Sequence, residues 1–263
     1  MTDESREDTL RRRKIRRRIH YLTVSGSILA IGFALWAGLY SDWIRIRTVN
    51  AEVRDDLNQD IAKDTWNFIT GQKFIGVPDT NALLLNRSEL NVLLVKQFPE
   101  MRNFQFVYNV PQRTLHVRAT PRETAALLCE AASRCYAMDD KAIPFKLQDA
   151  SASGRFLQIM DQSGMQIDLG TQAIPNEYFE ALVDYWNAGQ RLGVLTNAVI
   201  ERESIDAGYI RFDTSQGWYL LVKTNLDPEN TYTKIQAVLK QEIKDPRKLS
   251  YIDARYTDKV YYK

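Results

Sequence analysis

The chain has 263 residues, with 35 lysines and arginines against 33 aspartates and glutamates, 44% hydrophobic residues and only 2 cysteines. This composition excludes a collagen-like chain, a disulfide-rich miniprotein and a mainly disordered protein. The length allows one large or two small domains, each able to bury a core. The charge is uneven, because residues 1–20 hold eight basic and four acidic side chains.

Residues 21–40 form a run without a single charged side chain, and a helix of about 20 residues spans about 30 Å of hydrocarbon. Aromatic side chains stand near both ends of the run, as is typical of membrane interfaces. Basic residues beside a span stay in the cytoplasm. The sequence therefore predicts a cytoplasmic basic tail over 1–20, a transmembrane helix over 21–40 in contact with membrane lipid, and a carboxyl-terminal part outside the cytoplasm.

Other readings of this segment stay open. A cleaved signal peptide has an apolar core of about 7 to 15 residues and a small-residue cleavage site, whereas Trp36 stands where cleavage would fall. A buried helix of a globular domain is a second alternative, but such a helix would need no cluster of basic residues beside it. The basic tail also has the charge to bind nucleic acid or anionic lipid, but we expect it to set topology and to have no nucleic-acid partner.

Residues 44–120 predict a compact α+β unit. Alternating apolar residues predict a strand over 44–49, and helical spacing predicts helices over 57–69 and 86–98, the second with a capping box at its start. Two further alternating runs, 104–108 and 115–119, predict a hairpin. The order strand, helix, helix, strand, strand is typical of a small independent domain.

Residues 121–263 predict a mainly antiparallel β domain with two helices. Turn signals containing glycine recur between apolar runs, and helical spacing predicts helices over 178–186 and 228–243. The chain finishes with predicted strands over 249–256 and 260–262, joined by a turn. The expected fold class is thus α+β, with one transmembrane helix, an α+β module and a β domain.

Cys129 and Cys135 flank five residues that suit the tip of a hairpin. Outside the cytoplasm, oxidising conditions permit a disulfide, and closing so short a loop restricts the unfolded chain by about 2 kcal/mol. A metal site would need further ligands, and no histidine or second cysteine pair lies nearby in the sequence. We expect a structural disulfide.

The sequence contains no recognisable catalytic arrangement, and we expect no enzymatic activity, no cofactor and no metal. His116 falls on the polar side of its predicted strand, away from any nucleophile and carboxylate pair. Two acidic pairs have the chemistry of a glycosidase: Glu201 with Glu203, and Asp139 with Asp140. Neighbouring acidic residues are more typical of a solvated face, but a cell-wall hydrolase using Glu201 or Glu203 remains an alternative.

The carboxyl-terminal strand is the natural candidate for binding. The edge of a sheet offers unpaired N–H and C=O groups to which an extended partner can add a strand. Aromatic residues and arginine are favoured at interfaces, and this region is rich in them: Tyr251, Arg255, Tyr256, Tyr261 and Tyr262. The alternative is that these rings cover the domain's own core.

The order of the predicted segments along the chain resembles that of the bacterial cell-division family FtsQ, called DivIB in some lineages. Members of this family have a basic tail, one membrane span, a POTRA module and a β domain. The resemblance rests on three stretches: Asn81-Ala-Leu-Leu-Leu leading to residues 95–102, the run Tyr108-Asn-Val-Pro-Gln-Arg-Thr-Leu-His-Val, and the ending 249–263. It covers nearly the full chain, and the ending Tyr-Ile-Asp-x-Arg-Tyr is its most specific part.

The resemblance implies a scaffold of the divisome, at the septum and the inner or plasma membrane, that holds FtsB-type and FtsL-type partners and links assembly to peptidoglycan synthesis. It also implies that the POTRA module recruits other divisome components. The partner-binding residues that it implies on this sequence are Arg255, Tyr256, Asp258, Val260, Tyr261 and Tyr262. A POTRA-type chaperone or translocation subunit is the alternative function.

Overall fold

The computed structural model describes residues 20–34, 36–37, 40–72, 80–131, 134–148 and 156–263. The chain forms two compact units. The first unit comprises the residues up to Leu94 together with Phe104–Ala119, and the second comprises Val95–Asn103 and Thr120–Lys263. Apart from His20, the basic tail predicted for residues 1–20 lies outside the described residues.

The prediction of a transmembrane helix over residues 21–40 is wrong. Residues 20–34, 36–37 and 40 are helical, but within the described ranges no helix is both long and apolar enough to cross a membrane.

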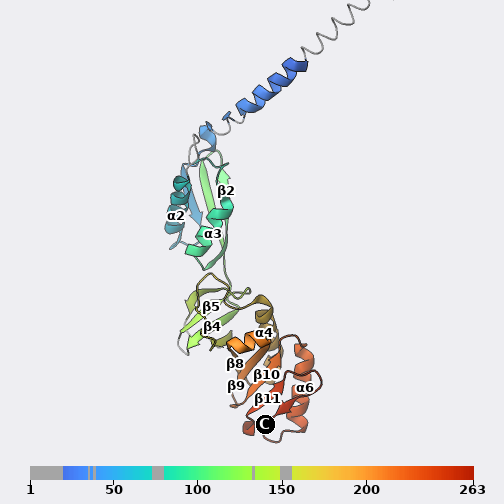
Figure 1. Cartoon of the computed structure of the whole chain (residues 1–263). Coiled ribbons are helices and arrows are strands. Elements are labelled where there is room, and N and C mark those ends of the chain that lie inside the picture. Colours follow the sequence, from blue (N-terminus) through green and yellow to red (C-terminus); the bar gives the residue numbers. More distant parts are fainter. Residues whose placement is uncertain (1–19, 35, 38–39, 73–79, 132–133, 149–155) are drawn as a thin grey trace, which may run out of the picture. The chain divides into compact units, whose positions relative to one another are not determined.

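The first unit follows the predicted order of strand, helix, helix, strand, strand (Figure 1). Its elements, after the short helix η1 (Asp42–Ile44), are β1 (Thr48–Glu52), α2 (Asn58–Gly71), α3 (Arg87–Gln97), β2 (Met101–Asn109) and β3 (Thr114–Pro121). The strands form a sheet in the order β1-β3-β2, with β1 parallel to β3. Apolar residues on one face of each helix are fully buried, including Ile61 of α2 and Leu90 of α3.

Local sequence signals explain the limits of these helices. The first half of the predicted capping box of α3 is confirmed, because Asn86 Oδ1 accepts the backbone N–H of Glu89 at 3.2 Å. In place of the reciprocal backbone bond of a full capping box, the Asn86 side-chain amide donates to the Glu89 carboxylate at 3.0 Å. Helix α2 ends at Gly71, two residues beyond the predicted range. The hairpin strands are longer than the predicted ranges, because the pairing of β2 and β3 continues past the apolar runs that mark them.

The second unit is built on a sheet with the strand order β12-β11-β10-β9-β8-β7-β4-β5-β6. The strands are β4 (Ala126–Ala131), β5 (Arg134–Met138), β6 (Pro144–Gln148), β7 (Leu157–Asp161), β8 (Leu195–Ile200), β9 (Tyr209–Thr214), β10 (Tyr219–Lys223), β11 (Tyr251–Ala254) and β12 (Tyr261–Tyr262). The sheet is mixed, because β4 with β7, β7 with β8, and β10 with β11 are parallel. The other five described pairings are antiparallel, so the sheet is mainly antiparallel, as predicted.

Two long helices cover one face of this sheet: α4 (Asn176–Gly189) and α6 (Pro228–Gln241). Shorter helices connect the strands: η3 (Gln190–Leu192), α5 (Arg202–Ala207) and η4 (Pro246–Lys248). The core between helices and sheet includes Leu182 and Tyr185 from α4, Ile235 from α6, and Phe212 and Ile252 from the sheet. Alternate residues of β9 and β10 point to this core, and the residues between them form the opposite, half-exposed face. In β11 only Tyr251 is half-exposed, and the other three residues are buried.

The predicted disulfide joins Cys129 and Cys135. The two residues are directly opposite each other in the β4–β5 hairpin, and both are buried. They pack with Leu127, Ala137 and Phe145 in a small apolar cluster. The bridge thus fixes the register of the hairpin near its tip.

A buried ion pair holds the start of the second unit together. Arg122 and Asp139 contact each other with side chains that are only 4% and 2% exposed. Arg122 Nε also donates to the carbonyl of Pro99 at 3.0 Å, and Asp139 Oδ1 accepts the backbone N–H groups of Lys141 and Ile143, each at 3.0 Å. One guanidinium and one carboxylate therefore tie three backbone segments to one another.

We predict that Arg122→Ala lowers the free energy of unfolding by about 3 to 5 kcal/mol, because it leaves the buried Asp139 carboxylate unpaired. The matched control is the neighbouring exposed pair, in which Arg102 donates to Asp140 at 2.9 Å; Arg102→Ala should cost about 0 to 1 kcal/mol. Urea unfolding of both variants measures the difference. Equal effects would contradict a special role for the buried pair.

Tyr178 on α4 is a buried titratable group whose hydroxyl donates to the carbonyl of Tyr209 at 2.8 Å. Burial raises the pKa of Tyr178 to about 12, and the hydrogen bond with Ser204 offsets part of that effect. The phenol therefore keeps its proton in the folded chain at a pH where the unfolded chain releases it.

Because this pKa is higher in the folded state, the stabilising contribution of Tyr178 is complete below about pH 10 and is lost as the pH rises through about 12. Tyr178→Phe removes that titration. We predict that the wild-type chain loses about 2 kcal/mol more than Tyr178→Phe between about pH 9 and about pH 11.5, measured by urea unfolding. Tyr256→Phe, at an exposed position, should match the wild type, and parallel profiles for wild type and Tyr178→Phe would refute the assignment.

Candidate functional site

The candidate site is the edge of the large sheet formed by β12. Within the described part of the chain, no strand pairs with the outer side of β12. Its inner side pairs antiparallel with β11, where Tyr261 lies opposite Asp253 and Tyr262 opposite Ile252. The carboxyl-terminal strands predicted from the sequence are therefore present, but β12 is confined to two residues.

The hydrogen bonds at the end of β12 show which backbone groups are occupied. Lys263 N–H donates to Tyr251 O at 3.2 Å, and Tyr251 N–H donates to Lys263 O at 3.4 Å. In an antiparallel pair, residues alternate between those that exchange such bonds and those that do not. Because Lys263 exchanges them, the N–H and C=O of Tyr262 point away from β11, toward the open side of the sheet.

Three tyrosine side chains stand exposed around this edge. Tyr256, Tyr261 and Tyr262 are 51%, 49% and 44% exposed. The rings of Tyr256 and Tyr261 meet edge to face, with centroids 5.3 Å apart. These rings therefore do not cover the unit's own core, and they form an aromatic rim beside the outward backbone groups of Tyr262.

Arg255 directly follows β11 and is held in place by Asp253 of that strand. Its guanidinium donates to both carboxylate oxygens of Asp253, at 2.9 and 2.6 Å, and lies 5.1 Å from the ring centroid of Tyr209. The hydrogen bond to Asp253 raises the pKa of Arg255 above its ordinary value. Arg255 therefore stabilises the end of β11 in addition to standing beside the edge.

The turn between β11 and β12 is anchored to α6. Lys234 Nζ donates to the carbonyl of Thr257 at 2.5 Å. Asp258 is exposed in this turn, whereas Val260 is half-buried and packs against the main core. All six sequence-predicted residues thus lie in or beside one turn and one edge strand. Sequence reasoning did not identify Lys234, because its role depends on the packing of α6 against this turn.

The half-exposed face of the sheet beside the edge carries a row of stacked side chains. Tyr219 and Tyr251 stack across β10 and β11 with centroids 5.7 Å apart, and Arg211 lies 4.6 Å from the centroid of Tyr219. Tyr251 therefore belongs to this row and not to the exposed aromatic rim. A sequence pattern alone does not reveal the row, because it depends on the register of three strands.

The sequence candidates for catalysis are engaged in structural contacts. Glu201 precedes α5, and its backbone N–H donates to the Ser204 hydroxyl at 2.9 Å. His116 Nδ1 lies 3.1 Å from Glu52 Oε1 on the outer face of the first unit's sheet. Among the described residues, no group of three or more His, Cys, Asp or Glu side chains is placed to hold a metal ion.

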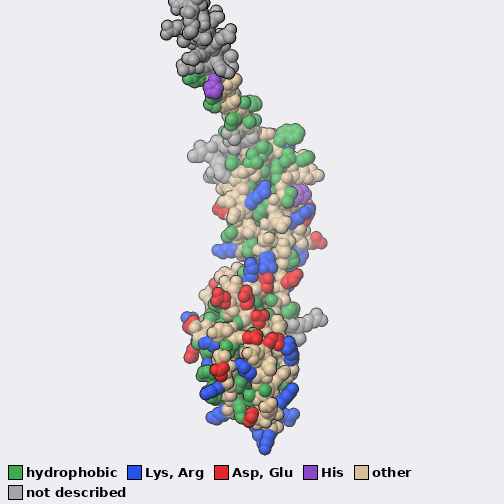
Figure 2. Space-filling model, turned by 90° about the vertical axis from the view of Figure 1, so that its right-hand side faces the viewer, with side chains coloured by type: hydrophobic (Ala, Val, Ile, Leu, Met, Phe, Trp, Pro, Cys, Tyr) green, Lys and Arg blue, Asp and Glu red, His purple; other side chains and the backbone are tan. Residues whose placement is uncertain are grey.

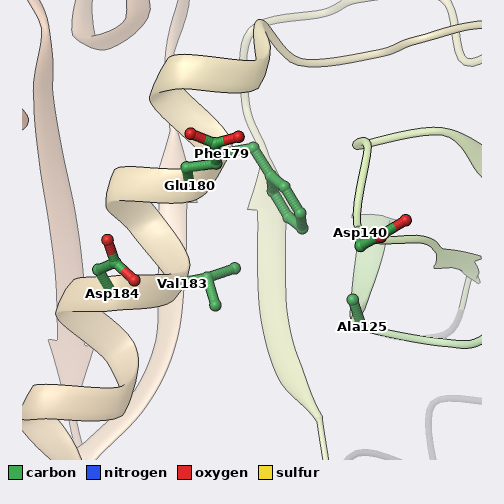
Figure 3. A pocket seen from close by; sticks show the side chains of 6 residues that line it. All are labelled: Ala125, Asp140, Phe179, Glu180, Val183 and Asp184. Atoms are coloured by element: carbon green, nitrogen blue, oxygen red, sulfur yellow. The ribbon is translucent and has the colours of Figure 1, made fainter.

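A pocket of about 330 Å³ lies beside α4 in the second unit (Figure 3). Its lining combines apolar side chains with three carboxylates: Ala125, Asp140, Phe179, Glu180, Val183 and Asp184. Asp140 is already paired with Arg102, and Glu180 and Asp184 are exposed to solvent. No buried polar group points to a ligand here, so we assign the pocket no function.

The first unit has an open edge of its own along β2. In the order β1-β3-β2, no described strand covers the outer side of β2. Phe104 N–H donates to Asn91 Oδ1 of α3 at 2.7 Å, so the backbone of Phe104 faces this side. By the alternation of a hairpin, Phe106 and Tyr108 face the same way.

Comparison with protein-family models finds no match for this chain, and comparison with curated proteins finds none either.

We predict that Arg255→Ala lowers the free energy of unfolding by about 1 to 3 kcal/mol, because Asp253, whose side chain is 10% exposed, loses its charged hydrogen-bond partner. Arg255→Lys should fall between that variant and the wild type, since an ammonium cannot replace both bonds. Lys259→Ala, at an exposed position of the same turn, should stay within about 0.5 kcal/mol of the wild type. Urea unfolding tests this prediction. An Arg255→Ala variant with an unchanged free energy of unfolding would contradict the stabilising role of the contact between Arg255 and Asp253.

Proposed function

We propose that this chain is a non-enzymatic scaffold of the bacterial divisome that recruits a partner by β-strand addition at β12. The partners are FtsB-type and FtsL-type proteins, and their recruitment at the division septum couples assembly to peptidoglycan synthesis. Binding takes its affinity from main-chain hydrogen bonds and its specificity from the side chains beside them.

The observation that carries this proposal is the outward N–H and C=O of Tyr262 on an edge strand that no described strand covers. Two unpaired backbone groups alone would be a weak site. The exposed rings of Tyr256, Tyr261 and Tyr262 add the aromatic surface from which interface hot spots are commonly made.

The assignment to the divisome is supported by the resemblance of the ending Tyr251-Ile-Asp-Ala-Arg-Tyr256 to the FtsQ and DivIB family. This stretch spans β11 and the start of the turn. The disulfide between Cys129 and Cys135 supports an oxidising compartment outside the cytoplasm for the second unit. By the same resemblance, we propose that other divisome components bind the first unit.

The β2 edge favours one rival function, a POTRA-type chaperone or translocation subunit that guides extended polypeptide. The observation in its favour is that no described strand covers the outer side of β2. The N–H of Phe104 on this side is already bonded to Asn91, which limits the edge as a binding site. Crosslinking separates the two functions, since the scaffold would capture FtsB-type and FtsL-type proteins and the chaperone would capture transported precursors. The hydrolase alternative has no such support, because Glu201 and Glu203 lie at the start of the short helix α5 and do not line the pocket beside α4.

The proposal predicts a graded loss of affinity at Tyr262 for the FtsB-type protein of the same organism, measured by biolayer interferometry. Tyr262→Ala keeps the outward N–H and loses the ring, whereas Tyr262→Pro loses both without removing a donor to β11. We expect Tyr262→Pro to bind about 2- to 10-fold more weakly than Tyr262→Ala, the range for one lost hydrogen bond. Tyr256→Lys should weaken binding at least about ten-fold.

The control is Leu147→Lys on β6, at the opposite edge of the same sheet, where the side chain is 60% exposed. This variant should bind like the wild type. Circular dichroism shows whether each variant keeps its fold. Undiminished binding by folded Tyr256→Lys and Tyr262→Pro would refute β-strand addition at β12.

A further inference from the structure

The outer edge of β12 is framed by basic side chains. The basic rim, as we name it, consists of Arg247, Lys248, Lys259 and Lys263, all exposed. In Figure 2 lysine and arginine side chains gather at the end of the second unit that carries the carboxyl-terminal residues. The rim differs from Arg255, whose charge is already paired with Asp253.

The fold places the rim at both ends of the edge strand. Lys263 directly follows β12, and Lys259 stands two residues before it. Helix η4, which contains Arg247 and Lys248, leads into Ser250, whose N–H donates to Lys263 O at 2.5 Å. The two ends of β12 are therefore each bordered by positive charge.

Among the described residues, no carboxylate forms an ion pair with any of the four side chains of the rim. The acidic side chains nearby are few: Asp258 is exposed in the turn, and Asp245 caps η4 by accepting the backbone N–H of Arg247. Within residues 244–263 the sequence holds six basic and three acidic side chains, so this stretch carries a net positive charge whose field extends over β12.

A strand added to β12 would run through this field. Neighbouring strands lie about 4.8 Å apart and rise about 3.4 Å per residue, so a strand that covers Tyr261 and Tyr262 places its own flanks beside Lys259 and Lys263. At 0.1 M salt, charges interact over about 10 Å. Acidic residues on these flanks would be attracted, and basic ones repelled.

We propose that the basic rim makes β12 selective for an extended segment with acidic residues on both sides of a short β-forming core, an inference that rests on the proposed strand addition. Lysines on an edge strand also oppose unspecific pairing with other sheets. Repulsion of basic strands and attraction of acidic strands together give specificity.

The test uses two synthetic peptides that share the core Val-Thr-Val-Thr and carry either two glutamates or two lysines at each end. Titration into the isotopically labelled full chain, followed by NMR of the Tyr262 amide, gives their affinities. We expect the acidic peptide to bind about ten-fold more tightly than the basic one at low salt, with the gap closing near 0.5 M salt. Lys259→Glu with Lys263→Glu should reverse the order.

The matched control is Lys141→Glu with Lys146→Glu, which makes the same change in net charge near the opposite edge of the sheet. This variant should keep the preference for the acidic peptide. If both peptides shift the Tyr262 amide with equal affinity, the charge selection is wrong while strand addition stands. If neither peptide affects Tyr262, both the selection and the proposed function are contradicted.

Discussion

The functional account depends on the pairing of β12 with β11. Lys263 exchanges both backbone hydrogen bonds with Tyr251, and this single pair sets the alternation for the strand. A shift by one residue would turn the amide of Tyr262 inward and its side chain to the other face of the sheet. The edge therefore presents its backbone and its rings only in this register.

Several contacts stabilise that register from outside the strand. Arg255 holds the end of β11 through Asp253, Lys234 holds the turn through Thr257, and Val260 packs against the core. None of these contacts uses the outer side of β12. The unit can therefore keep the edge ordered while its outer backbone groups and the tyrosines around it stay accessible, which reduces the entropic cost of binding.

Local patterns in the sequence predicted much of the fold and of the candidate site. The capping box at Asn86, the disulfide hairpin and the turn before β12 all depend on residues close together in the chain. The parallel pairing of β10 with β11 and the buried Arg122–Asp139 pair depend on tertiary contacts that no local pattern encodes. The transmembrane prediction, which rested on an uncharged run, was wrong, because none of the helices in the described residues is both long and apolar enough to cross a membrane.

Hydrogen exchange at β12 tests the central claim most directly. In the free chain, the amide of Lys263, which is bonded to Tyr251, should exchange more slowly than the outward amide of Tyr262. Binding of an FtsB-type partner should slow exchange at Tyr262 and leave Lys263 little changed. A Tyr262 amide that is already protected in the free chain, or that exchanges equally fast in the complex, would contradict the account.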